Sequence, residues 1–180
     1  MLVREFAPFV LHRTYVGHAD DVLSITWSKN GRFFLTTSKD MTARLFSLHP
    51  IDGFRPHTFT GHRDSVLRAY FSLDERTIYT VSRDGACLTW RPKEDAEEAA
   101  DGEAQGDPEE AIGRARWGVA QRNYFMQPNA QVACTAFHAG TSRLVVGFTT
   151  GVFSLWDMPD FQNVYTPVSY THLRAHETLR

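Results

Sequence analysis

Cysteine is scarce in this chain, whose 180 residues include only two, Cys87 and Cys134. Two cysteines placed so far apart argue against a disulfide framework and favour a reducing, intracellular compartment. No apolar run approaches the ~18 residues that a membrane-spanning helix needs, and residues 1–6 lack the apolar core of a signal peptide. The sequence therefore predicts neither a disulfide-stapled secreted domain nor a membrane protein.

Patterns that hold metals or phosphates are missing as well. No Cys-x-x-Cys pair occurs, and the one His-x-x-x-His pair, His172 and His176, lies in a terminal stretch that is interpreted differently below. No glycine-rich loop opens a helix, because Gly147 and Gly151 flank a predicted strand–turn–strand. We therefore expect no metal, no cofactor and no small-molecule substrate.

Basic residues are absent from residues 94–110, a stretch that contains nine of the chain's 21 acidic residues. The slightly longer stretch 94–111 has no aromatic residue, so it cannot bury enough apolar surface to offset the entropy lost on ordering. We predict an acidic, disordered loop at 94–111; the alternative interpretation is a docking segment for a basic partner. Outside it, the 19 basic residues outnumber the acidic ones, which is compatible with a polyanionic partner such as RNA.

A repeat organises the rest of the chain. Residues 61–91 open with Gly-His, alternate in polarity, turn at Ser-Arg-Asp-Gly and close on Thr-Trp. Matching features recur 44 positions earlier, starting from Gly17. A self-match of this period, with a Gly-His opening and an aromatic close, is typical of a WD40 β-propeller blade.

A third unit keeps the register without an insertion but has lost two landmarks. Pro128 stands at the His position and Thr150 at the position of the turn Asp. We therefore predict an all-β fold over residues 1–166, made of about three consecutive blades of an incomplete WD40 propeller. The predicted blades are 9–60, 61–125 and 126–166.

Alternation and turn residues predict the individual strands within these units. Asn30-Gly31 is a strong hairpin signal in the first unit. Val66 and Val132 align with Val22 near the start of each inner strand. The other predicted strands cover residues 9–15, 33–37, 42–48, 78–81, 87–90, 116–125, 144–148, 152–155 and 161–165.

Three units are too few for closure, because a propeller closes with ~4–8 blades. We therefore expect the sequence to be a piece of a longer protein. Residues 167–180 have no propeller pattern and contain the string SYTHLRAHET, which resembles the translation of sequencing-adaptor DNA at the end of an assembled transcript. We interpret 167–180 as a non-native tail and assign no site to its histidines.

Two sets of His, Ser and Asp recur at the repeat spacing and raise the question of catalysis, because His can deprotonate Ser while Asp orients His. An enzyme needs one such set, whereas a structural device is expected once per blade, and no Gly-x-Ser-x-Gly surrounds either Ser. We predict no catalytic residue, and instead a structural network in which Asp holds the imidazole and Ser links it to an indole N–H. The network residues are His18, Ser38, Asp40, His62, Ser82, Asp84 and Trp90.

Longer phrases are more specific than the repeat landmarks. The stretches PFVLHRTYVGHADDVLSITWSKNGRFFLTTSKDMTARLF and GHRDSVLRAYFSLDERTIYTVSRDGACLTW resemble the first propeller of the periodic tryptophan protein 2 family, as does VVGFTTGVFSLW in the third unit. The resemblance implies tandem WD40 propellers followed by a helical region. It also implies a nucleolar scaffold of the small-subunit processome that associates with U3 small nucleolar RNA and serves early cleavage of pre-ribosomal RNA.

The resemblance thus implies a non-catalytic, nuclear binding protein for ribosome biogenesis. Its partners would be other processome proteins, U3 RNA and pre-ribosomal RNA, contacted directly or through partners. Two alternatives stay open: a WD40 adaptor of another complex, such as a ubiquitin-ligase substrate receptor, and a hydrolase that uses His62 and Ser82. Tyr70 and Tyr124 are candidates for stacking on bases, although packing between blades is the favoured interpretation.

Overall fold

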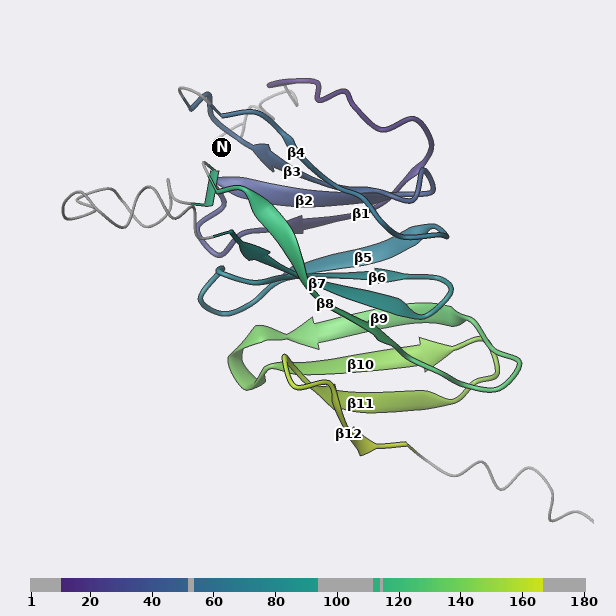
Figure 1. The fold of residues 1–180 in the computed structure, drawn as a ribbon. Helices are drawn as coiled ribbons and strands as arrows, with labels where there is room; N and C mark the ends of the chain where they lie inside the picture. The colour runs from purple at the N-terminus through teal and green to yellow at the C-terminus, as the bar shows by residue number, and fades with distance from the viewer. Residues whose placement is uncertain (1–10, 52–53, 94–111, 114, 167–180) are drawn as a thin grey trace, which may run out of the picture.

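The computed structural model describes residues 11–51, 54–93, 112–113 and 115–166, which form three stacked antiparallel sheets (Figure 1). The acidic loop predicted at 94–111 and the non-native tail predicted at 167–180 lie outside the described residues. Within the described ranges, no helix is long and apolar enough to cross a membrane.

The first sheet is a four-stranded meander in which each strand pairs with the strand before it. The β1–β2 turn places Gly31 at φ 73°, a left-handed conformation that glycine adopts without steric cost. The hairpin predicted from Asn30-Gly31 is therefore confirmed. The strands are β1 (Val22–Trp27), β2 (Phe33–Ser38), β3 (Ala43–Ser47) and β4 (His57–Phe59).

The second and third sheets repeat this meander. The second contains β5 (Val66–Phe71), β6 (Ile78–Ser82), β7 (Ala86–Pro92) and β8 (Trp117–Tyr124). The third contains β9 (Val132–His138), β10 (Arg143–Phe148), β11 (Phe153–Asp157) and β12 (Gln162–Tyr165). A short 3-10 turn, η1 (Ala139–Thr141), connects β9 to β10.

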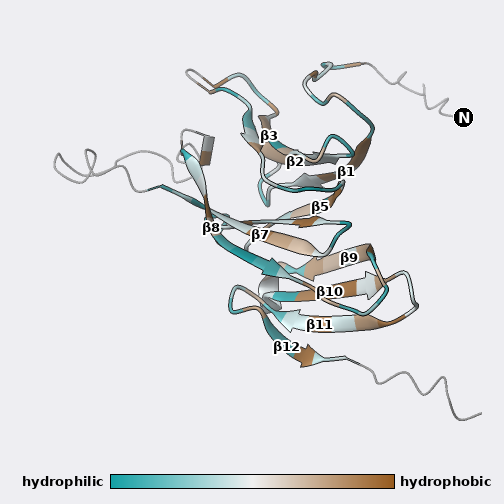
Figure 2. Cartoon of the chain, turned by 45° about the vertical axis from the view of Figure 1, so that its right-hand side comes forward, coloured by the Kyte–Doolittle hydropathy of each residue, from teal (hydrophilic) through white to brown (hydrophobic). Residues whose placement is uncertain are grey.

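The sheets pack face to face, and each of the two interfaces has its own apolar core. Alternation along β2 sends Phe33 and Leu35 into the core shared with the second sheet, while Phe34 lies on the opposite face and stacks on Phe46. Figure 2 shows that the later half of β8 is hydrophilic, and most side chains of this outer strand are exposed. The three four-stranded antiparallel sheets confirm the predicted all-β propeller fold.

One predicted strand is wrong where the structure describes it, because residues 11–15 form no strand. β4 already takes the fourth, outer position of the first sheet, so the four-stranded meander is complete without this segment. Instead the Tyr15 ring packs edge-on against Phe34, with ring centroids 4.9 Å apart, and its hydroxyl donates to the carbonyl of Leu48 at 3.1 Å. The segment is a strap across the far face of the first sheet.

Candidate functional site: the histidine networks

The two predicted His-Ser-Asp sets lie at one end of the stacked sheets. His18 and His62 precede the inner strands β1 and β5, while Asp40 and Asp84 lie in the β2–β3 and β6–β7 turns. Because neighbouring strands are antiparallel, the start of an inner strand and the turn after the second strand meet at the same end of the sheet. Each imidazole is therefore brought beside the second strand of its own sheet.

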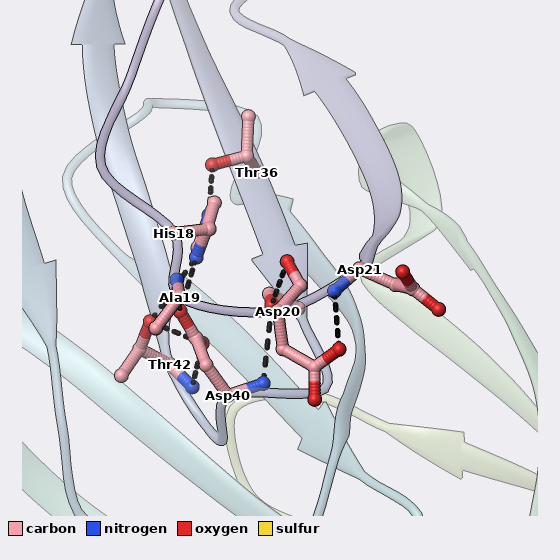
Figure 3. A network of polar contacts seen from close by, with 8 residues as sticks. His18, Ala19, Asp20, Asp21, Thr36, Asp40 and Thr42 are labelled. Atoms are coloured by element: carbon pink, nitrogen blue, oxygen red, sulfur yellow. Dashed lines mark hydrogen bonds and ion pairs between the residues drawn. The ribbon is translucent and has the colours of Figure 1, made fainter.

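In the first sheet the imidazole of His18 joins the turn to the strand (Figure 3). Its Nδ1 lies 2.8 Å from Oδ2 of Asp40, and its Nε2 lies 2.7 Å from Oγ1 of Thr36. The backbone N–H of Ala19 also donates to Oδ2 of Asp40, at 3.0 Å. The backbone N–H and the hydroxyl of Thr42 donate to Oδ1, at 3.0 and 2.7 Å. Both carboxylate oxygens of Asp40 are therefore used by the protein's own chain.

The hydrogen bonds keep this carboxyl group ionised. Burial by itself would raise the pKa of Asp40, but the bonds donated by Thr42 and Ala19 and the contact with His18 outweigh burial and hold that pKa well below its usual value. Asp40 thus ties the Gly-His loop to the β2–β3 turn, which is a structural task.

In the second sheet the central hydroxyl belongs to a residue that the sequence patterns did not reveal. Oγ1 of Thr80 accepts the indole N–H of Trp90 at 2.9 Å and lies 2.7 Å from Nε2 of His62. Thr80, and not Ser82, therefore links the indole to the imidazole. Thr80 sits in mid-strand opposite Leu88, on the face that also carries Trp90, whereas Ser82 ends β6 beside the turn.

Ser82 and Asp84 serve the β6–β7 turn instead. The Ser82 hydroxyl donates to Oδ1 of Asp84, and the same oxygen accepts the N–H of Ala86 at 3.1 Å. Asp84 is exposed, and Nδ1 of His62 has no hydrogen-bond partner among the described residues. The structure thus brings His62 and Asp84 to the same end of the sheet without joining them by a hydrogen bond.

In the first sheet Ser38 likewise serves the neighbouring turn and loop. The hydroxyl of Ser38 donates to the carbonyl of Asp20 and accepts the N–H of Asp40, each at 3.1 Å. Neither Ser38 nor Ser82 contacts an imidazole in the described chain, because in both sheets a threonine two residues earlier takes that place. Thr36 and Thr80 recur at the 44-residue spacing, and that recurrence is the signal in the sequence that could have found them.

Burial dominates the chemistry of His62, which is 8% exposed. It lowers the pKa of His62 to about 4, because desolvation disfavours the imidazolium; Asp84 opposes the shift and Arg122 adds to it. The imidazole is therefore neutral at physiological pH.

The residues that align with Trp90 in the first and third sheets explain why the indole network is not repeated there. Phe46 replaces the indole in the first sheet and has no N–H to donate. In the third sheet Val146 aligns with Thr80, so the N–H of Trp156 turns to Oγ of Ser154, at 2.6 Å on the same strand. The network with an indole donor is thus found in the second sheet alone among those described.

The geometry does not assemble a hydrolytic site from His62 and Ser82. Ser82 has no exposed surface, and its hydroxyl points to Asp84. Burial raises the pKa of the Cys87 thiol to about 12, so that side chain is a protonated core residue. In the described ranges, no group of three or more His, Cys, Asp or Glu side chains is arranged to hold a metal ion.

Tyr70 belongs to the packing between sheets. Its hydroxyl donates to the carbonyl of Thr135 at 2.7 Å, and its ring lies against Phe137 with centroids 5.7 Å apart. The favoured interpretation of Tyr70 as a packing residue is therefore confirmed. Tyr124 is 40% exposed on β8.

Comparison with known families places the repeat. The model described as "WD domain, G-beta repeat" matches residues 9–47 and 53–91. Among solved structures, the C-terminal WD40 domain of Sif2 superposes with a TM-score of 0.56 at 16% identity, covering 81% of this chain and 34% of that domain's chain. At this identity the likeness concerns the fold.

Whole-sequence comparison gives closer relatives. The chain is 49% identical over 164 residues to the periodic tryptophan protein 2 homolog of Schizosaccharomyces pombe, which covers 90% of this chain and 19% of that protein. It is 43% identical over 163 residues to periodic tryptophan protein 2 of Saccharomyces cerevisiae, covering 88% of this chain and 18% of that protein. The chain therefore spans about a fifth of the length of the relatives it matches.

Proposed function

Because this chain is a WD40-repeat member of the periodic tryptophan protein 2 family, we propose that it serves as a non-catalytic scaffold segment of the small-subunit processome. In this role it associates with U3 small nucleolar RNA, directly or through partners, and is required for early processing of pre-ribosomal RNA. Its place of action is the nucleolus.

The observation that carries the proposal is the 43–49% identity to relatives of that name along about nine-tenths of the chain. The geometry supports a binding role over a catalytic one. The hydrogen bonds of Asp40 hold the loop of His18 to the β2–β3 turn. The hydroxyl of Thr80 accepts the indole N–H of Trp90 and so joins β6 to β7. These groups therefore have structural partners. A stack of such sheets holds its connecting loops in fixed positions, which is what a multi-partner scaffold requires.

The test uses the full-length protein that contains this chain, tagged in its own organism and placed under a repressible promoter. We expect nucleolar fluorescence, co-purification of U3 RNA, and accumulation of uncleaved pre-ribosomal RNA on northern blots after repression. A protein spread through the cytoplasm, with no U3 RNA in the purified complex and normal precursor levels after repression, would overturn the proposal.

The same purification addresses the second candidate, an adaptor of another complex such as a ubiquitin ligase. The fold alone is compatible with it, because unrelated functions share the WD40 architecture. Ligase subunits in place of ribosomal precursors would favour the adaptor.

A further inference from the structure

The far face of the first sheet, at one end of the stack in Figure 1, repeats a surface that is buried on the second sheet. The second sheet packs on the first through side chains that are at most 7% exposed: Ala69, Phe71, Ile78, Leu88 and Trp90. Their counterparts 44 positions earlier, on the far face of the first sheet, are Ile25, Trp27, Phe34, Arg44 and Phe46. Ile25 is 58% exposed and Trp27 is 53% exposed, so the first sheet has this docking face without a sheet that covers it.

The strap shows how a neighbouring sheet would lie on this face. Tyr15 and Phe59 each stand two residues before a Gly-His pair. The ring of Phe59, on the outer strand β4, packs edge-on against Trp90 of the second sheet, with centroids 5.0 Å apart. The ring of Tyr15 packs in the same manner against Phe46, the counterpart of Trp90, at 5.6 Å. Tyr15 therefore contacts the first sheet as the outer strand of a neighbouring sheet contacts the second.

Arg44 departs from the apolar character of this face. It stands where the second sheet has Leu88, and it runs so close to Gly17 that a Cβ there would overlap its Nη1. The Nε of Arg44 is buried without a hydrogen-bond partner, and Arg44 takes part in none of the ion pairs between described residues. A buried donor on a charged group is costly without an acceptor, so we expect the complete protein to supply one.

The polar groups beside Arg44 are already engaged. Asp40, in the neighbouring β2–β3 turn, uses its two carboxylate oxygens for His18 and Thr42. Thr36 lies opposite Arg44 in the pairing of β2 with β3, and its hydroxyl contacts Nε2 of His18. The acceptor for Arg44 therefore comes from outside the described residues.

The longer relatives have room for such a partner. The chain spans about a fifth of their length, and its three sheets are fewer than the ~4–8 that close a propeller. We propose that a further β-sheet of the same protein packs on the far face of the first sheet and presents an Asp or Glu that forms an ion pair with Arg44. A carboxylate fits a guanidinium best, because the two groups can form parallel charge-assisted hydrogen bonds. The proposal rests on the side chains of this face and is independent of the processome assignment.

The first experiment identifies what covers the face. Benzoylphenylalanine replaces Ile25 in the full-length protein inside cells, and the crosslinked peptide is identified by mass spectrometry. The matched control carries the same photoreactive residue at Val119, which is 47% exposed on the outer strand β8. We expect a peptide of the same polypeptide, outside residues 1–180, with alternating apolar residues and an Asp or Glu.

Four results of this crosslinking would overturn the proposal. They are a crosslink to another protein or to RNA, a crosslink to a differently tagged second copy, a crosslink within residues 1–180, and a yield no higher than that of the control.

The second experiment tests the ion pair by exchanging charges in the full-length protein. Arg44→Glu should lower the midpoint of thermal unfolding, because it places two carboxylates together inside the interface. Changing the acidic residue found by crosslinking to Arg in the same protein should restore most of that loss. Arg63→Glu, at an exposed position of the second Gly-His loop, is the control and should leave the midpoint unchanged.

A second series covers the case in which Arg44→Glu does not fold. Arg44→Leu introduces the residue of the second sheet and should also lower the midpoint, because it leaves the partner's carboxylate buried without a cation. Leucine at both positions should restore it, since an apolar pair can replace a buried ion pair. A double variant no more stable than its Arg44 single variant would overturn the proposal.

Discussion

Thr80 is the residue through which the second sheet joins its loop to its third strand. Its single hydroxyl takes the indole N–H of Trp90 and meets the imidazole of His62, and all three side chains are buried. A buried network of this kind stabilises one arrangement only while each member keeps its partner. Removing the Thr80 hydroxyl alone should therefore show how much the network contributes to the free energy of unfolding.

Thr80→Val keeps the shape of the side chain but leaves the buried Nε2 of His62 and Nε1 of Trp90 without their partner. It should therefore lower the free energy of unfolding by about 1–3 kcal/mol. The matched control is Thr89→Val on the next strand. Thr89 is equally buried, and its hydroxyl has no partner among the described residues, so that variant should be neutral or slightly stabilising. Urea denaturation followed by tryptophan fluorescence compares the two; equal midpoints would contradict the network.

His62 makes stability depend on pH. Its pKa of about 4 in the folded protein lies below the ~6.5 of an unfolded histidine. Between these values the unfolded state binds a proton that the folded state does not, so stability falls as pH drops from about 6.5 to about 4. His62→Gln should flatten this part of the stability curve, while His12→Gln, at an exposed position, should retain it. Unfolding midpoints across the pH range measure the difference.

At the scale of elements, two turns of the meanders can be compared because each places a glycine at positive φ. Gly31 and Gly85 both have positive φ, 73° and 89°. Around Gly31 there is open space, whereas a Cβ at Gly85 would overlap the carbonyl oxygen of Phe125. Substitutions at the two glycines therefore distinguish the cost of a left-handed backbone conformation from the cost of a steric overlap.

Gly31→Ala should cost roughly 1–2 kcal/mol, the strain of a left-handed residue. Gly85→Ala should cost clearly more, because the backbone of Phe125 has to move as well. Chemical denaturation of both variants measures the ranking. If Gly85→Ala were no worse than Gly31→Ala, the close approach of the β6–β7 turn to Phe125 would be refuted.

The strands were predictable from the sequence because alternation, Asn30-Gly31 and the Gly-His openings act locally. Residues 11–15, the described part of the strand predicted at 9–15, form no strand because β4 supplies the fourth strand of the first sheet, and no local pattern reports which segment takes that position. The predicted network was wrong in the partners of Ser38, Ser82 and Asp84 for a similar reason. Ser82 and Thr80 both carry a hydroxyl and, two positions apart, lie on the same face of β6, so only the register with β7 shows that Thr80 is the one near Trp90.

At the scale of the whole molecule, the outermost faces of the stack differ from its interior. The far face of the third sheet carries Phe153 and Tyr165, which are 48% and 54% exposed with ring centroids 6.4 Å apart. On the far face of the first sheet, Ile25 is 58% exposed. Exposed apolar side chains gathered on a sheet face favour association.

We expect the 180-residue chain to self-associate through these faces in sedimentation velocity experiments. Phe153→Lys combined with Ile25→Lys should reduce the increase of the sedimentation coefficient with concentration. Val119→Lys adds a charge at an exposed position of the rim strand β8 and should have no such effect. An unchanged concentration dependence in the double variant would contradict this role of the two faces.

The long excursion between β7 and β8 has a consequence for synthesis on the ribosome. Sheets one and three are built from strands that follow one another closely, but β7 ends at Pro92 and its partner begins at Trp117. At about 5–20 residues per second, the outer edge of β7 waits roughly 1–5 seconds for β8 to be made. During that interval the edge is open to pairing with a wrong strand. Pro92 has no N–H to donate, so one end of the waiting edge offers an intruding strand a weaker ladder.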